Sequence, residues 1–168
     1  GPLLGRDPGG GQGGPDGPGP VLAPAGPWGE SVLAGRLVLG RILGATADEV
    51  PPDWRFYAGG GGSVRGYPFQ SIGPETAAGT PAGGTSLLEA SVELRQRIDE
   101  RWGGVVFVDA GSVSDQGALG SEGLAVGVGT GVRWFTPVGP VRFDLATPLN
   151  PSDGDAPVQL YIGIGQAF

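Results

Sequence analysis

The segment that decides the fold is SLLEASVELRQRI, residues 86–98, in which apolar and polar side chains alternate. The even positions from Leu88 to Ile98 are apolar except for Gln96, and the odd positions carry glutamate, serine or arginine. A period of two places alternate side chains on opposite faces of a β-strand, whereas a helix would scatter them around its circumference. The segment therefore predicts a strand with one apolar and one charged face.

Similar alternation recurs along the chain and predicts an all-β fold. Strands are expected at residues 31–43, 86–98, 102–113, 124–135, 141–147 and 158–168. Short turns and long loops alternate between them, as is typical of antiparallel strands. In the fourth strand Gly127, Gly129 and Gly131 share one face, which leaves room for a bulky group to approach the backbone.

Two environments fit strands with one apolar and one polar face. In a soluble β-sandwich the apolar face packs on a second sheet, and in an outer-membrane barrel it meets lipid while the polar face lines the lumen. Trp102 and Trp134 lie near strand ends, as interfacial girdle residues do, and the chain ends on Phe168, which favours the barrel. Six strands cannot close a barrel, for which eight is about the minimum, so we expect an open curved sheet.

A loop at residues 50–85 interrupts the strands and includes VPPDWRFYAGGGGSVRGYPFQSIGP, residues 50–74. Its aromatic side chains are costly to leave in water, so we expect the loop to fold inward. Glycines 59–62 allow the chain to reverse, because glycine takes positive φ freely. Arg65 would then be carried inside, where an arginine needs a carboxylate.

Glu93 and Asp109 lie on the polar faces of successive predicted strands. Two carboxylates that are close across a strand pair repel, and a guanidinium between them relieves the repulsion. The sequence therefore predicts that Arg65 anchors the loop. The alternative is that Arg65 is an ordinary solvated loop charge.

Composition narrows the classes of function. The 168 residues include no Cys, Met or His, the ten basic residues are all arginine, and the net charge is −7. Without Cys, His or Lys, no catalytic triad, thiol or Schiff-base chemistry can be assembled, so we expect no enzyme and no cofactor. The acidic balance argues against nucleic acid as a partner.

The sequence also offers two weaker candidate sites, and its N-terminal region has a distinct composition. Glu89 and Glu93 could form an acid–base pair, and Asp153 with Asp155 could bind calcium, although a plain turn is the simpler interpretation. The Gly- and Pro-rich residues 1–30 predict a flexible loop or linker. Because the chain begins at Gly1 without an initiator Met or a signal peptide, we expect a piece of a longer product.

Several motifs, in order, resemble the BamA/TamA superfamily of outer-membrane assembly barrels. VRGY (64–67) followed by FQSIGP (69–74) resembles the family's sixth extracellular loop, FVDAG (107–111) its F-x-D-x-G strand motif, and SVEL (91–94) the preceding strand. VGPVRFD (138–144) and YIGIG (161–165) look closer to TamA than to BamA. The resemblance covers residues 31–168.

The resemblance implies the last six strands of a sixteen-stranded barrel in the bacterial outer membrane, preceded by POTRA domains. Its loop-anchoring cluster would comprise Arg65, Gly66, Tyr67, Glu93, Phe107, Asp109 and Gly111. Its C-terminal assembly signal would comprise Tyr161, Gly163 and Phe168, with Gln166 where an apolar residue is usual. The implied partners are the lipid bilayer, unfolded outer-membrane or autotransporter substrates, and a TamB-like periplasmic or inner-membrane subunit.

The implied function is insertion or secretion of such substrates. Alternatives within the membrane class are BamA itself or the transporter of a two-partner secretion pair. Alternatives from other classes are a passive outer-membrane channel and a soluble β-sandwich adhesin.

Overall fold

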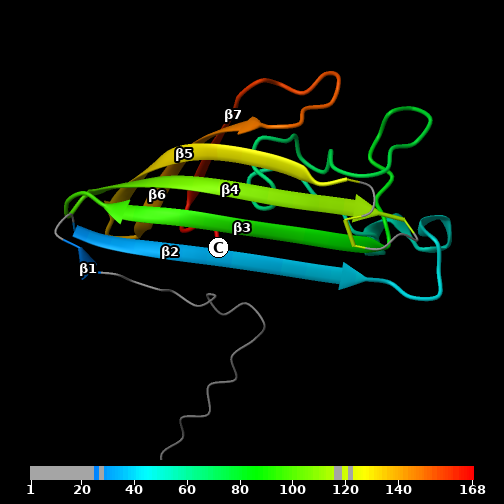
Figure 1. Ribbon diagram of the computed structural model, residues 1–168, viewed down its shortest axis with the longest axis horizontal. Helices are drawn as coiled ribbons and strands as arrows, with labels where there is room; N and C mark the ends of the chain where they lie inside the picture. The colour runs from blue at the N-terminus through cyan, green and yellow to red at the C-terminus, as the bar shows by residue number, and fades with distance from the viewer. Residues whose placement is uncertain (1–24, 27–28, 116–118, 121–122) are drawn as a thin grey trace, which may run out of the picture.

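The structure, a computed structural model, describes residues 25–26, 29–115, 119–120 and 123–168. The prediction for residues 1–30 falls largely outside this range. The described chain forms one antiparallel sheet in which the strands lie side by side in sequence order (Figure 1). The strands are β1 (Ala25–Gly26), β2 (Gly29–Arg41), β3 (Ser86–Arg97), β4 (Trp102–Ser114), β5 (Ala125–Thr136), β6 (Gly139–Pro148) and β7 (Gln159–Ile164).

The six expected strands are all present, so the prediction of an open antiparallel sheet is confirmed, and the two-residue β1 is an addition. Two short 3₁₀ turns, η1 (Ala47–Glu49) and η2 (Pro52–Trp54), lie in the loop that joins β2 to β3. Tight turns join strands at one end of the sheet, and the long loops gather at the other end (Figure 1). None of the helical segments among the described residues is long and apolar enough to cross a membrane.

The two faces of the sheet are inverted relative to a water-soluble protein. Apolar side chains are exposed on the outer face, among them Leu37, Val92, Leu94, Val106, Val108, Val132, Leu145 and Ile162. The carboxylates of Glu93, Asp109 and Asp144 on the inner face are 0% exposed. Water-soluble domains seldom expose a contiguous apolar face, whereas a membrane barrel presents apolar residues to lipid.

The inverted faces overturn the β-sandwich alternative. A sandwich would cover the apolar face of this sheet with a second sheet, and the described residues form a single one. Trp102 and Trp134, which are cross-strand partners at the turn end of the sheet, stack with ring centroids 6.2 Å apart. Each is 44% exposed, as girdle residues at a membrane interface are.

The expected extent of the last strand is wrong. We expected the strand to extend over residues 158–168, but β7 ends at Ile164. Gly165 has a φ of +92°, which turns the chain out of the strand. The Phe168 ring instead lies 5.1 Å from the guanidinium of Arg95, and Arg95 Nη2 donates to the Phe168 carbonyl at 3.2 Å.

Candidate functional site

The loop between β2 and β3 folds back along the inner face of the sheet. Isolated bridges pair Phe56 with Gly84 and Ala58 with Ile72, so the loop closes on itself. Ala58 then packs against Leu87 and Val113 of the strands. This apolar contact places the segment that contains Arg65 over the middle of the sheet.

Arg65 is buried and binds Asp109 of β4 through two parallel hydrogen bonds. The distances are 2.6 Å from Nε to Oδ2 and 2.9 Å from Nη2 to Oδ1. The Arg65 backbone N–H also donates to Asp109 Oδ2 at 3.1 Å. This bidentate geometry is the strongest pairing available to a guanidinium, and it fixes both the side chain and the backbone of the loop.

Two further carboxylates converge on Arg65. Its Nη1 lies 2.6 Å from Oε1 of Glu93 on β3 and 3.3 Å from Oδ2 of Asp144 on β6. Its guanidinium also lies 3.4 Å from the centroid of the Phe107 ring, a cation–π contact. Three strands therefore hold one loop side chain.

Neighbouring side chains balance the charge of these carboxylates. Arg133 Nη1 lies 2.5 Å from Asp144 Oδ1, and Arg95 Nε lies 2.7 Å from Glu93 Oε2. Ser91 Oγ donates to Asp109 Oδ1 at 2.8 Å. Cations and anions thus alternate across the inner face, which lowers the repulsion among the buried carboxylates.

The pKa of Arg65 is shifted by two opposing effects. Burial alone lowers it, but the hydrogen bonds and charges of Asp109 and Glu93 outweigh burial and raise the pKa above its ordinary value. The guanidinium of Arg65 therefore stays charged.

Glycines on the inner face make room for the cluster. Gly127 is the cross-strand partner of Asp109, and a Cβ there would collide with the Arg65 carbonyl oxygen. Gly129 opposes Phe107, whose ring lies over it, and a Cβ at Gly131 would meet the Asp144 carboxylate. The predicted space for a bulky group is thus filled by three parts of the same cluster.

Gly66 and Tyr67 continue the anchored segment. Gly66 has a φ of +102°, and a Cβ there would lie 3.0 Å from the Thr147 carbonyl, so a larger residue would be strained. The buried Tyr67 hydroxyl donates to Asn150 Oδ1 at 2.6 Å. Burial raises the pKa of Tyr67 above its ordinary value.

The structure brings together all seven residues of the predicted cluster. Gly111 contributes through its small size, because a Cβ there would lie 2.6 Å from Val64 Cγ2. Of the predicted C-terminal signal, Tyr161 points into the cluster and Gly163 lies beside Arg142, but Phe168 lies apart at Arg95.

Sequence reasoning missed Asp144, Arg133 and Ser91. The available signal for Asp144 was its alternation with Phe143 and Leu145, which places it on the inner face of its strand. Nothing in that pattern says which cation it meets, because Arg65 is 79 residues away in the sequence.

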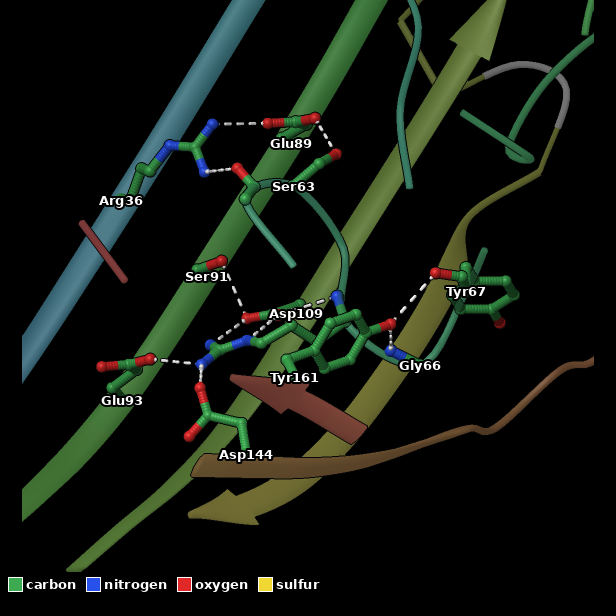
Figure 2. Close-up of polar contacts among 12 residues, drawn as sticks. Arg36, Ser63, Gly66, Tyr67, Glu89, Ser91, Glu93, Asp109, Asp144 and Tyr161 are labelled. Carbon is green, nitrogen blue, oxygen red and sulfur yellow. Dashed lines mark hydrogen bonds and ion pairs between the residues drawn. The ribbon is translucent and has the colours of Figure 1, made fainter. Parts of the chain in front are cut away.

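A second set of contacts, also missed, holds the loop two residues before Arg65. Arg36 of β2 binds Glu89 of β3 at 2.6 Å and donates to the Gly62 carbonyl at 3.1 Å. Ser63 Oγ donates to the other oxygen of Glu89, as Figure 2 shows. We call Arg36, Glu89, Gly62 and Ser63 the second anchor.

The side chains of the weaker candidate sites, the acid–base pair and the calcium site, bind other groups of the protein. Glu89 and Glu93, the alternative acid–base pair, each bind arginine. Asp155 accepts the Ser152 backbone N–H at 2.7 Å within a turn. Within the ranges that the structure describes, no group of three or more acidic, His or Cys residues is placed to hold a metal ion.

An open sheet with its apolar face outward and an ion-paired loop on its inner face defines a segment of an outer-membrane β-barrel. The Omp85 superfamily domain matches residues 25–168, and the chain belongs to the Omp85 superfamily. The chain is accordingly part of an integral barrel of the outer membrane, as the sequence predicted.

Individual relatives agree with this assignment. The outer membrane protein assembly factor BamA of Nitratidesulfovibrio vulgaris is 33% identical over 124 residues, covering 71% of this chain and 16% of the relative. The chloroplastic outer envelope protein 39 of Arabidopsis thaliana is 30% identical over 128 residues, covering 71% of this chain and 32% of the relative. The crystal structure of BamA from Haemophilus ducreyi lacking POTRA domains 1–3 superposes with a TM-score of 0.62 at 25% identity, covering 79% of this chain and 30% of that one.

The chain therefore spans 16–32% of the length of these relatives. Two of the three are BamA proteins. The resemblance of the last strands to TamA stays a prediction.

Proposed function

We propose that this chain is the barrel segment of a protein that inserts or translocates other proteins at the outer membrane, and that the cluster around Arg65 keeps the loop inside the barrel. The observation that carries the proposal is the buried bidentate pair between Arg65 and Asp109, supported by Glu93. Membership of the Omp85 superfamily and the printed role of BamA as an assembly factor support the same class of function.

The chemistry of the site favours a structural role for the loop. Arg65 and its three carboxylates are buried and satisfy one another, which suits a fixed anchor better than a reacting centre. The proposed substrates are unfolded outer-membrane or autotransporter proteins, with a TamB-like subunit as the partner. The TamA branch is proposed on the sequence motifs of β6 and β7.

We also propose that the C-terminal assembly signal, Tyr161, Gly163 and Phe168, serves in recognition of the barrel during its own assembly; Phe168 lies beyond the end of β7. Leu160, Ile162 and Ile164 present the apolar outer face of this strand. An exposed strand edge can template the pairing of an incoming strand.

Substrate assembly in cells that carry the full-length protein tests the proposal. Arg65→Glu reverses the charge of the anchor, and we expect it to lower the yield of folded substrate when barrel abundance is matched. Arg41→Ala removes an exposed arginine at the end of β2 and is the control. Normal substrate assembly with Arg65→Glu would contradict the proposal, whereas an effect on solute leakage alone would favour a passive channel.

A further inference from the structure

Tyr161 lies on β7, but its side chain belongs to the interior of the sheet. Its sequence neighbours Leu160 and Ile162 are exposed on the outer face. Its ring packs instead against the buried side chains of Val105, Phe107 and Ala146. Tyr161 is therefore the aromatic residue that β7 contributes to the inner face of the sheet, which faces the loop and which we call the wall.

The Tyr161 hydroxyl makes two hydrogen bonds to the loop backbone. It accepts the Gly66 N–H at 3.0 Å and donates to the Tyr67 carbonyl at 3.1 Å (Figure 2). A phenol can donate one hydrogen bond while it accepts another, so both of its functions are used. The ring also touches the loop, because a Cβ at Gly61 would lie 2.9 Å from Tyr161 Cδ1.

These contacts join the anchored segment to the last strand. The ion pairs of Arg65 join the same segment to β3, β4 and β6 through Glu93, Asp109 and Asp144. Within the described chain, Tyr161 is the β7 residue whose side chain hydrogen-bonds the loop. The second anchor joins the loop to β2 and β3.

Among the described residues, the backbone of β7 pairs with β6. The strand has six residues, and its register with β6 runs from Val141 opposite Ile164 to Ala146 opposite Gln159. The two side-chain hydrogen bonds of Tyr161 add to this ladder and tie the strand to the loop.

We infer that Tyr161 is a positioning residue that couples the loop to the last strand. When β7 separates from β6, the Gly66 and Tyr67 backbone groups lose their partner, and when the loop leaves the wall, β7 loses the same two bonds. Coupling of this kind is reciprocal by thermodynamic necessity. The inference rests on these contacts and not on the proposed assembly function.

Hydrogen exchange of the full-length protein in nanodiscs, read by mass spectrometry, tests the coupling. Tyr161→Phe keeps the ring and removes the hydroxyl. We expect exchange to become faster, by about fivefold for each lost hydrogen bond, both in β7 and in residues 64–67. Tyr57→Phe is the matched control, because it removes a loop hydroxyl that bonds only the Pro52 carbonyl within the described chain.

A double variant separates coupling from simple loss of packing. Arg65→Lys keeps the charge but loses the bidentate geometry, so we expect it to loosen the loop. It should speed exchange in β7 when Tyr161 is present and have no such effect when combined with Tyr161→Phe. Additive effects of the two substitutions, or faster exchange in β7 with an unchanged loop in Tyr161→Phe, would overturn the inference. Failure of the assembly function would leave these exchange rates as expected.

Discussion

Arg65 of the loop and Asp109 of β4 are 44 residues apart in the sequence and form a buried bidentate ion pair, with Nε 2.6 Å from Oδ2. The pair joins the loop to the wall at the point where Glu93 and Asp144 also converge. Removal of one partner of a buried ion pair leaves the other without compensation, at a cost of about 3–5 kcal/mol.

Arg65→Ala should lower the free energy of unfolding by about 3 kcal/mol, because three carboxylates lose their shared cation. The midpoint of heat- or urea-induced loss of the folded band on cold gels measures this change. Asp109→Ala combined with Arg65→Ala should cost less than the sum of the two single variants, since the pair is coupled. Additivity within about 0.5 kcal/mol would show that the two residues act independently.

Gly127→Val should expel the loop, because any Cβ at this position collides with the Arg65 carbonyl. Limited proteolysis between residues 59 and 72 should then become faster by at least tenfold, a change of about 1.4 kcal/mol in the opening equilibrium. Gly62→Ala is the control, because a Cβ there meets nothing within 4 Å. Equal protease resistance of Gly127→Val and the unaltered protein would contradict the close packing of loop and wall.

Asp144→Asn tests a residue that sequence reasoning missed. It should remove ion pairs with both Arg65 and Arg133 and lower the unfolding midpoint, although by less than Asp109→Asn, because the Arg65 contact to Asp144 is the longer one. If Asp144→Asn lowered the unfolding midpoint more than Asp109→Asn, Arg133 would be a more important partner of Asp144 than Arg65 is.

Glu89→Gln should weaken the second anchor by about 1 kcal/mol or less, because its partner Arg36 is partly exposed to water. We expect faster hydrogen exchange at Gly62 and Ser63 with little change at Arg65. If hydrogen exchange at Arg65 became faster by as much as at Ser63, the second anchor and the cluster around Arg65 would open together.

Tyr67 gives the loop a dependence on alkaline pH. Burial raises its pKa, so the folded state favours the neutral phenol. The resulting stability is fully present below the unfolded pKa of about 10 and is lost as pH rises through the higher folded value. The absorbance titration of the phenolate, as the difference between the unaltered protein and Tyr67→Phe, should therefore show a midpoint above 10; a midpoint at or below 10 would contradict the burial of this hydroxyl.

The sequence predicted those features that depend on local pattern. Alternation gave the strands and their charged face, and it put Glu93 and Asp109 on neighbouring strands because adjacent antiparallel strands pair in sequence order. The inward path of the loop followed from its aromatic residues and glycines.

Other features depend on register and on contacts between distant parts of the chain. Alternation does not specify cross-strand positions. These positions decide which glycine faces Arg65, and they bring Asp144 of β6 and Tyr161 of β7 to the loop. The end of β7 was misplaced because Gly165 adopts a positive φ, which Gly163 in the same pattern does not.

The central claim is that Arg65 holds the loop against the inner wall, and thiol labelling tests it most directly. This chain has no cysteine, so Val64→Cys introduces a single thiol into it beside Arg65 at a position that is 0% exposed. We predict slow maleimide labelling of Val64→Cys in the purified full-length protein, fast labelling when Arg65→Ala is added, and fast labelling of Phe69→Cys in both backgrounds, because Phe69 is 78% exposed. Labelling of Val64→Cys as fast as that of Phe69→Cys while Arg65 is intact would contradict the claim.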